Sequence, residues 1–146
     1  MEAKPRGLER FVQAQERVYS DVLAELRAGR KESHWMWFVF PQIRGLGRSA
    51  TAEYYGIQDI DEARGYLLHT LLGVRILECT GLVLGHRERT ARGMFGFPDD
   101  LKLCSSMTLF HQLSPSPNNV FRNVIDSFYA GKPDEQTLRL LIDTKT

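Results

Sequence analysis

The sequence predicts a mainly α-helical fold, built as one compact domain of several helices. Three observations predict it: apolar residues recur at helical spacing along most of the chain, capping residues precede these runs, and glycine or proline follows them. Strand signals are confined to Trp35–Phe40, which leaves open an α+β alternative with one or two very short strands. A length of 146 residues fits a single globular domain covering 1–146, with enough apolar side chains for a core.

The N-terminal part is predicted to begin with one long helix. Apolar residues recur at three- and four-residue steps from Leu8 to Ala28, and Gly29 follows as a natural C-terminal stop. The aromatic segment, residues 31–42, comes next. It fits either one to two turns of buried helix or a short strand, and Pro41 ends it.

Three helical runs are predicted in the middle of the chain. Ser49 can cap a short helix that ends at Gly56. Asp59 and Glu62 resemble a capping pair at the start of a second run. A third apolar run covers 71–84 and is followed by a glycine.

The C-terminal part is predicted to hold three more helices and two irregular stretches. Pro98 marks a helix start, since Asp99 and Asp100 would then occupy the first turn, where a helix dipole favours carboxylates. In chain order we expect a mixed-charge loop over 86–96, a helix from Pro98 to about Leu113, a turn cluster over 114–119, and helices over 120–130 and 134–142.

Composition excludes several classes of partner. The formal net charge of +1 creates no global field toward nucleic acid or an anionic membrane. No apolar run approaches the roughly 20 residues of a membrane span, and the N-terminus lacks the apolar core of a secretory signal. Cys79 and Cys104 have no neighbouring ligands at metal spacing, so we expect two buried free thiols in a reducing cytoplasm.

The aromatic segment is the first candidate for a ligand site. It contains both tryptophans, Trp35 and Trp37, which could form the stacking wall of a cleft or could simply be core. His34 stands beside Ser33 and Lys31, where a buried wall would meet a basic loop. A neutral imidazole there could donate or accept a proton, and the alternative is a structural, hydrogen-bonded histidine.

The glycine-rich turn, residues 44–49, is the second candidate. Gly45 and Gly47 would let backbone N–H groups approach an anion, and a helix that starts near Ser49 would add its positive end. Arg44 and Arg48 could clamp phosphate oxygens. The spacing matches neither a Walker nor a Rossmann motif, and the alternative is a plain turn with solvated arginines.

The third candidate is a polar stripe on the helix that follows Pro98. Asp99, Lys102 and Ser106 recur at steps of three and four and would lie on one helix face. The carboxylate could act as a general base or stabilise a developing oxocarbenium ion, with Lys102 orienting it or binding phosphate. A capping aspartate with a surface salt bridge is the alternative.

Six segments of the chain together match a known pattern. They are Leu8-Glu-Arg-Phe-Val-Gln-Ala-Gln15, Lys31-Glu-Ser-His-Trp-Met-Trp-Phe-Val-Phe-Pro-Gln42, Gly45-Leu-Gly-Arg-Ser49, Tyr66-Leu-Leu-His69, Leu72-Gly-Val-Arg75 and Phe97-Pro-Asp-Asp-Leu-Lys-Leu-Cys-Ser-Ser-Met-Thr-Leu-Phe110. On these residues the chain resembles domain-of-unknown-function family 1810, whose members are sometimes named calpastatin. The resemblance implies a compact, mainly helical domain without an established activity.

Two of these segments carry a second likeness. Phe11-Val-Gln-Ala-Gln15 and Asp99-Asp-Leu-Lys102, with Phe110 eight residues later, are similar to parts of NADAR domains. Those helical domains act on ribosyl-phosphate N-glycosidic bonds, so the likeness implies the same chemistry here. The NADAR pattern has a glutamate–histidine pair before its first aromatic residue, where this chain has Glu9 and Arg10.

These observations lead to a functional hypothesis: a small-molecule enzyme or binding domain for a phosphate-bearing, nucleotide-like or ADP-ribosyl ligand, with hydrolysis of an N-glycosidic bond as its chemistry. No cofactor, metal or membrane is expected, nucleic acid is disfavoured, and the oligomeric state stays open. The alternative is a non-catalytic interaction or ligand-binding module. The catalytic candidates are His34, Asp99 and Lys102, and the ligand-binding candidates are Lys31, Ser33, Trp35, Trp37, Gln42, Arg44, Gly45, Gly47, Arg48, Ser49 and Ser106.

Overall fold

The computed structural model describes residues 7–144 and is all-α over that range. Helices account for 63% of the described residues, and no strand is present among them. The only β-type pairing found between residues 7 and 144 is an isolated parallel bridge from Ile43 to Ile57. The prediction of a mainly α fold is confirmed.

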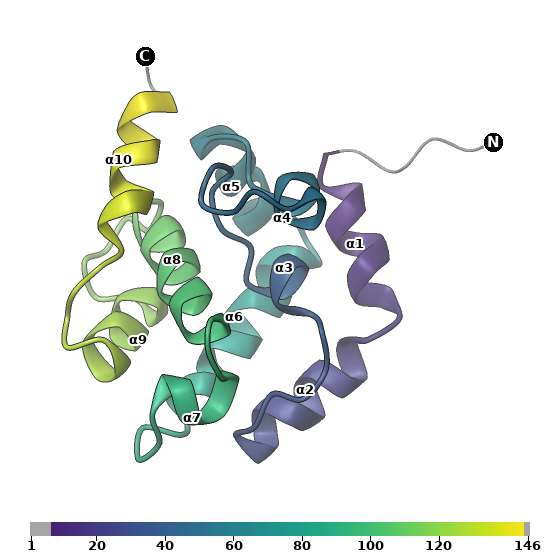
Figure 1. Ribbon diagram of the computed structural model, residues 1–146, viewed down its shortest axis with the longest axis vertical. Coiled ribbons are helices and arrows are strands. Elements are labelled where there is room, and N and C mark those ends of the chain that lie inside the picture. The colour runs from purple at the N-terminus through teal and green to yellow at the C-terminus, as the bar shows by residue number, and fades with distance from the viewer. Residues whose placement is uncertain (1–6, 145–146) are drawn as a thin grey trace.

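Ten helices follow one another in the described part of the chain (Figure 1). They are α1 Glu9–Glu16, α2 Tyr19–Ala28, α3 Met36–Val39, α4 Ala50–Tyr55, α5 Ile60–Leu68, α6 Leu72–Leu84, α7 Ala91–Phe95, α8 Asp99–His111, α9 Val120–Phe128 and α10 Glu135–Thr144.

The predicted long N-terminal helix is divided into α1 and α2. Val18 interrupts it with φ −127° and ψ −3°, outside helical geometry, and the chain direction turns between the two helices in Figure 1. Phe11 and Val22 are both fully buried, so the apolar spacing continues across the break. That continuity is why the sequence pattern showed one helix. Gly29 ends α2 with φ 72°, as expected for a C-terminal glycine.

The aromatic segment adopts the helical alternative, as the single turn α3. Its position is fixed from two sides, because the Phe38 carbonyl accepts hydrogen bonds from Gln15 Nε2 at 2.7 Å and Tyr66 Oη at 3.2 Å. Trp35 and Phe40 flank the turn and are fully buried in the core. A short helix this apolar depends on such tertiary contacts, because one turn has little stability of its own.

Two predicted caps are present. Ser49 Oγ accepts from the Ala52 N–H at 3.0 Å, and Asp59 Oδ1 accepts from the Glu62 N–H at 2.9 Å. The Glu62 carboxylate accepts from the Gln58 N–H instead of completing a capping box with Asp59.

The predicted loop over 86–96 is wrong in part, because it contains α7. Thr90 starts this helix by accepting from the Gly93 N–H at 2.9 Å, and Met94 and Phe95 are buried. Arginines among these residues hid the apolar pattern, which is too short to show a helical period.

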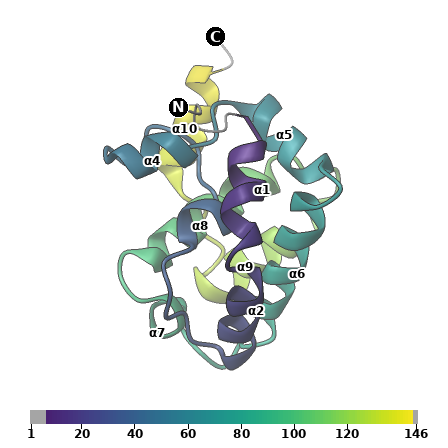
Figure 2. The ribbon, with the colours of Figure 1, turned by 90° about the vertical axis from the view of Figure 1, so that its right-hand side faces the viewer.

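Helix α8 lies at the centre of the fold and contacts α5, α7, α9 and α10. In Figure 1 the C-terminal helices α9 and α10 lie on the left of the molecule and α1 and α2 on the right; Figure 2, viewed from that right-hand side, shows α1 and α2 in front. The Phe110 ring of α8 packs between Tyr66 and Phe121, with ring centroids 5.4 and 5.7 Å away. This burial along α8 fixes where its N-terminal turn lies.

No single described helix is long and apolar enough to cross a bilayer. Helices α5 and α6 reach that length and hydropathy only when they are taken together, and the chain bends by 86° between them. Both cysteines are free thiols, as predicted; Cys79 is buried, whereas Cys104 is only half-buried. Burial raises the pKa of Cys79 to about 12 and that of Cys104 to about 11, so both thiols stay protonated and unreactive at neutral pH.

Candidate functional site

Three predicted site residues meet at the N-terminal turn of α8. Asp99 Oδ2 lies 2.9 Å from Lys31 Nζ, and Asp99 Oδ1 lies 3.3 Å from Lys102 Nζ. We call this the lysine–aspartate cluster. Two ammonium groups share one carboxylate, so the cluster carries one surplus positive charge.

Backbone geometry places the three side chains. Lys31 follows the end of α2, and its N–H donates to the Met94 carbonyl at 2.7 Å. Its Nζ also donates to the Ser33 carbonyl, and only 7% of the side chain is exposed. Asp99 and Lys102 are one turn apart on α8, with about a fifth of each side chain exposed. Lys31 is therefore the fixed member, and Lys102 is the one that meets solvent.

Trp37, on α3, contacts the lysine–aspartate cluster through Lys102. Lys102 Nζ lies 3.8 Å from the centroid of the Trp37 ring, which is a cation–π distance. Trp37 is half-buried, so part of its ring faces solvent. A Cβ atom on Gly47 would lie 4.0 Å from Trp37 Cη2, which shows that the glycine-rich turn passes the end of the ring.

Trp35 has a different environment from Trp37. It is fully buried, and its Nε1 donates to Glu25 Oε1 at 3.0 Å. It packs near Phe40 and Phe95, with ring centroids 6.2 and 6.3 Å away. Trp35 therefore belongs to the core, and no face of its ring is open to a stacking ligand.

Glu25 was not among the sequence candidates, although it organises this region. Its carboxylate accepts from the backbone N–H of Glu32, the N–H and hydroxyl of Ser33, and the Trp35 indole. Burial would raise its pKa, but the hydrogen bonds from Ser33, Glu32 and Trp35 outweigh burial and lower the pKa to about 2. Glu25, which is charged at neutral pH, thus fixes the start of the aromatic segment.

His34 is exposed and takes no part in these contacts. No described residue forms a hydrogen bond or ion pair with it. The residue before it, Ser33, contacts the lysine–aspartate cluster, because the Ser33 carbonyl accepts from Lys31 Nζ. The role of His34 as a catalytic residue stays a prediction.

The glycine-rich turn is held mainly through its backbone. The Ile57 N–H donates to the Gln42 carbonyl at 2.9 Å, and the Arg44 N–H donates to the Ile57 carbonyl at 2.8 Å. Gly45 has a φ of 109°, which residues with a side chain rarely adopt. The Arg44 and Arg48 side chains are exposed and have no hydrogen-bond partner among the described side chains.

Ser106 does not face a ligand site. Its side chain is fully buried, and its hydroxyl has no hydrogen-bond partner in the described structure. The spacing that placed it on the same helix face as Asp99 is correct for a helix. Two turns beyond Asp99, this face of α8 is covered by the helices that pack around it, which the spacing cannot reveal.

Arg10, the residue that departs from the NADAR pattern, forms a buried ion pair with Glu62. The Nη2–Oε1 distance is 2.9 Å, with 5% and 15% of the two side chains exposed. The Arg10 guanidinium also donates to three carbonyls, those of Gly7, Tyr54 and Gly56. Burial would raise the pKa of Glu62, but Arg10 and the Gln58 N–H lower it overall.

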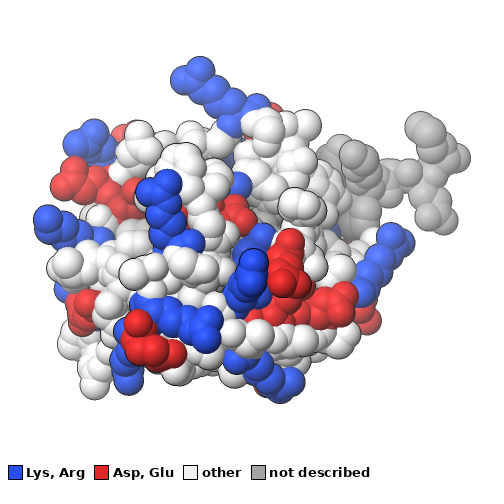
Figure 3. Space-filling view, turned by 60° about the horizontal axis from the view of Figure 1, so that its bottom comes forward, with Lys and Arg blue, Asp and Glu red and all other residues white. Residues whose placement is uncertain are grey.

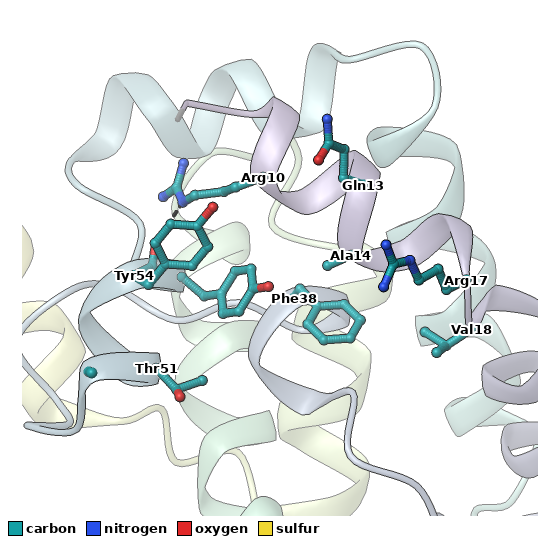
Figure 4. A pocket seen from close by; sticks show the side chains of 10 residues that line it. Arg10, Gln13, Ala14, Arg17, Val18, Phe38, Thr51 and Tyr54 are labelled. Atoms are coloured by element: carbon teal, nitrogen blue, oxygen red, sulfur yellow. Dashed lines mark hydrogen bonds between the residues drawn. The ribbon is translucent and has the colours of Figure 1, made fainter. Parts of the chain in front are cut away.

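A groove of about 720 Å³ lies between α1, α3 and α4, and none of the predicted site residues lines it (Figure 4). Phe38 and Tyr55 supply an aromatic wall, with ring centroids 5.4 Å apart. Its lining is Arg10, Gln13, Ala14, Arg17, Val18, Phe38, Ala50, Thr51, Tyr54 and Tyr55.

Comparison with known families assigns the chain. Residues 5–141 match the family described as "Protein of unknown function (DUF1810)". The chain belongs to this family. No curated protein matches it significantly.

One solved structure is closely similar, with a TM-score of 0.90 and 54% sequence identity. It is the crystal structure of the conserved hypothetical protein Rv1873 from Mycobacterium tuberculosis. The match covers 92% of this chain and 96% of that one, so the DUF1810 fold is shared over nearly its whole length.

Charge on the surface shown in Figure 3 is mixed. Basic and acidic side chains are interspersed there, and neither sign covers that face. Among the described residues, no group of three or more histidine, cysteine or acidic side chains is placed to hold a metal ion.

The groove was missed although its sequence signal was present. Arg10, Gln13, Ala14 and Arg17 recur at three- and one-residue steps along α1 and its C-terminal end, and they form a mostly polar face beside the one that carries the buried Phe11. A polar helix face is normally read as solvated, and only the packing of α3 and α4 beside it makes a groove.

Proposed function

We propose that this DUF1810 protein binds a small phosphate-bearing, nucleotide-like molecule at the lysine–aspartate cluster and Trp37. The surplus positive charge is the observation that carries the proposal. Lys31 and Lys102 both pair with Asp99, and all three side chains are at least three-quarters shielded from solvent. Shielding strengthens the attraction of an uncompensated ammonium for an anion.

The three side chains would divide the work by their exposure. Lys102 is the more exposed lysine and would meet the phosphate, whereas the buried Lys31 keeps Asp99 in place. The solvent-facing part of Trp37 would stack on a base or ribose. Arg48, in the turn that passes the ring, is a candidate for a second phosphate contact.

Titration with ADP-ribose, AMP and inorganic phosphate, followed by intrinsic tryptophan fluorescence, tests the proposal. Trp35 is buried beside Glu25, so Trp37 should report the binding and Trp37→Phe should remove the signal change. Lys102→Gln should weaken binding by about ten-fold or more, since a charge-assisted hydrogen bond is lost.

Lys132→Gln is the matched control, because this substitution removes the same charge from an exposed position on the segment before α10. Equal affinity of the wild type and Lys102→Gln, or a wild type that binds none of the three ligands, would contradict the proposal.

Hydrolysis of an N-glycosidic bond is a second candidate, favoured by the unequal pairing of Asp99. Its Oδ1 is 3.3 Å from Lys102, whereas its Oδ2 is 2.9 Å from Lys31. A phosphate that draws Lys102 away would leave Oδ1 free to stabilise positive charge developing on a ribose. His34 would then be the auxiliary acid or base.

Release of nicotinamide from nicotinamide mononucleotide, measured by chromatography, separates this candidate from simple binding. Asp99→Asn should abolish release and leave the circular dichroism spectrum unchanged. Ligand binding without any release in the wild type would instead establish the non-catalytic alternative, a ligand-binding module.

A further inference from the structure

The groove between α1, α3 and α4 has the features of a ligand site that is separate from the lysine–aspartate cluster. We infer that it binds a small molecule with a flat aromatic ring and a single anionic group. The inference rests on the wall, the charge and the polar groups of the groove, and it does not depend on the function proposed above.

The size and the wall of the groove suit an aromatic ring. A volume of about 720 Å³ is within the range of small-molecule pockets. The Tyr55 ring is held between Phe11 and Phe38, with centroids 6.0 and 5.4 Å away. The backbone that carries Phe38 is itself fixed, because the Phe38 carbonyl accepts from Gln15 and Tyr66. A flat ligand would therefore meet a wall that is already formed.

The charge of the groove selects an anion. Arg10 and Arg17 are the only charged residues in its lining. The Arg10 charge is balanced by Glu62 in a buried ion pair. Arg17 has no ion-pair or hydrogen-bond partner for its guanidinium among the described side chains. One uncompensated cation remains, and in Figure 4 its guanidinium extends from α1 to the side on which Phe38 lies.

Polar groups without partners complete the site. The hydroxyls of Tyr55 and Thr51 and the amide of Gln13 form no hydrogen bonds within the described structure. Burial, followed by the nearby Tyr54, raises the pKa of Tyr55, so its phenol stays protonated and can donate to a ligand. A few polar groups beside an apolar wall are typical of small-molecule sites.

Neighbouring residues of α3 keep this groove apart from the lysine–aspartate cluster. Trp37 contacts Lys102, whereas Phe38 contacts Tyr55. A ligand in the groove would thus be held by different side chains from a phosphate at Lys102, and each site can be altered without the other.

Two fluorescent probes that differ in one group test the inference. They are 8-anilinonaphthalene-1-sulfonate and the neutral N-phenyl-1-naphthylamine, which has the same rings without the sulfonate. Arg17→Gln should weaken binding of the sulfonate by about ten-fold and that of the neutral amine by less than about two-fold. Thr51→Trp, at an exposed position of the lining, should fill the groove and abolish binding of both probes.

Arg27→Gln removes the same charge from an exposed position on α2 and should change neither affinity. The inference is overturned if Arg17→Gln and Arg27→Gln weaken the sulfonate equally, if Thr51→Trp still binds the probes, or if the wild type binds neither. Lys102→Gln should leave both probe affinities unchanged, so failure here and failure of phosphate binding at Lys102 are distinguishable.

Discussion

The Arg10–Glu62 pair and the lysine–aspartate cluster use the same kinds of groups to different ends. Arg10 donates to both Glu62 oxygens and to three backbone carbonyls, so its charge and its donors are satisfied. Asp99 serves two lysines, and a positive charge remains. A saturated buried pair holds α1 against α4 and α5. The lysine–aspartate cluster is partly exposed and keeps a positive charge with which an anionic ligand can pair.

Breaking the saturated pair should have the largest effect on stability. Arg10→Met leaves the Glu62 carboxylate buried without its cation and should lower the free energy of unfolding by about 3–5 kcal/mol. Urea denaturation measures this. Arg64→Gln, which removes an exposed partner of Asp61, should cost less than about 1 kcal/mol. Similar losses in the two variants would show that burial does not set the Arg10–Glu62 pair apart from an exposed ion pair.

Glu25 extends the comparison to a carboxylate whose hydrogen-bond donors are all neutral groups. Its substitution should have the next largest effect on the free energy of unfolding. Glu25→Gln should cost about 1.5–3 kcal/mol at neutral pH, because an amide accepts these hydrogen bonds less well than a carboxylate.

The pH dependence has a defined sign. The pKa of Glu25 is lowered from 4.5 to about 2, so its stabilisation is present above pH 4.5 and is lost as the pH falls toward 2. Glu25→Gln should flatten the stability curve in that window, whereas the exposed Glu32→Gln should not. Parallel curves for the wild type and Glu25→Gln would disprove the role assigned to Glu25.

The open cluster should contribute little to stability. Lys102→Gln should change the free energy of unfolding by less than about 1 kcal/mol, because Lys31 still pairs with Asp99 and the lost charge is partly exposed. Thermal melts check this. A loss of several kcal/mol would instead show that Lys102 stabilises the fold, as Arg10 does.

Ser106 should show the smallest effect. Ser106→Ala removes a buried hydroxyl that has no partner, so stability should stay the same or rise slightly. Thr108→Val is the matched contrast, because its hydroxyl donates to the Cys104 carbonyl and accepts from the Asp134 N–H. It should cost about 1–3 kcal/mol. A comparable loss at Ser106 would reveal a partner for its hydroxyl.

The sequence by itself determined the local features of this protein. Helical spacing predicted the all-α fold, and Ser49, Asp59 and Gly29 predicted helix ends that the structure contains. These features depend on backbone geometry and hydrogen bonds within a few residues, which a short window of sequence contains. The sequence also singled out Lys31, Asp99 and Lys102 as polar groups in unusual places.

Only the tertiary structure decided which of these groups meet and which side of each is open. Trp35 and Trp37 are two residues apart in an apolar run, yet one is fully buried beside Glu25 and the other faces Lys102 and solvent. The groove along Arg17 exists only because α3 and α4 pack beside α1. Burial and contact between distant segments depend on how helices pack against one another, and spacing within one segment carries no record of that packing.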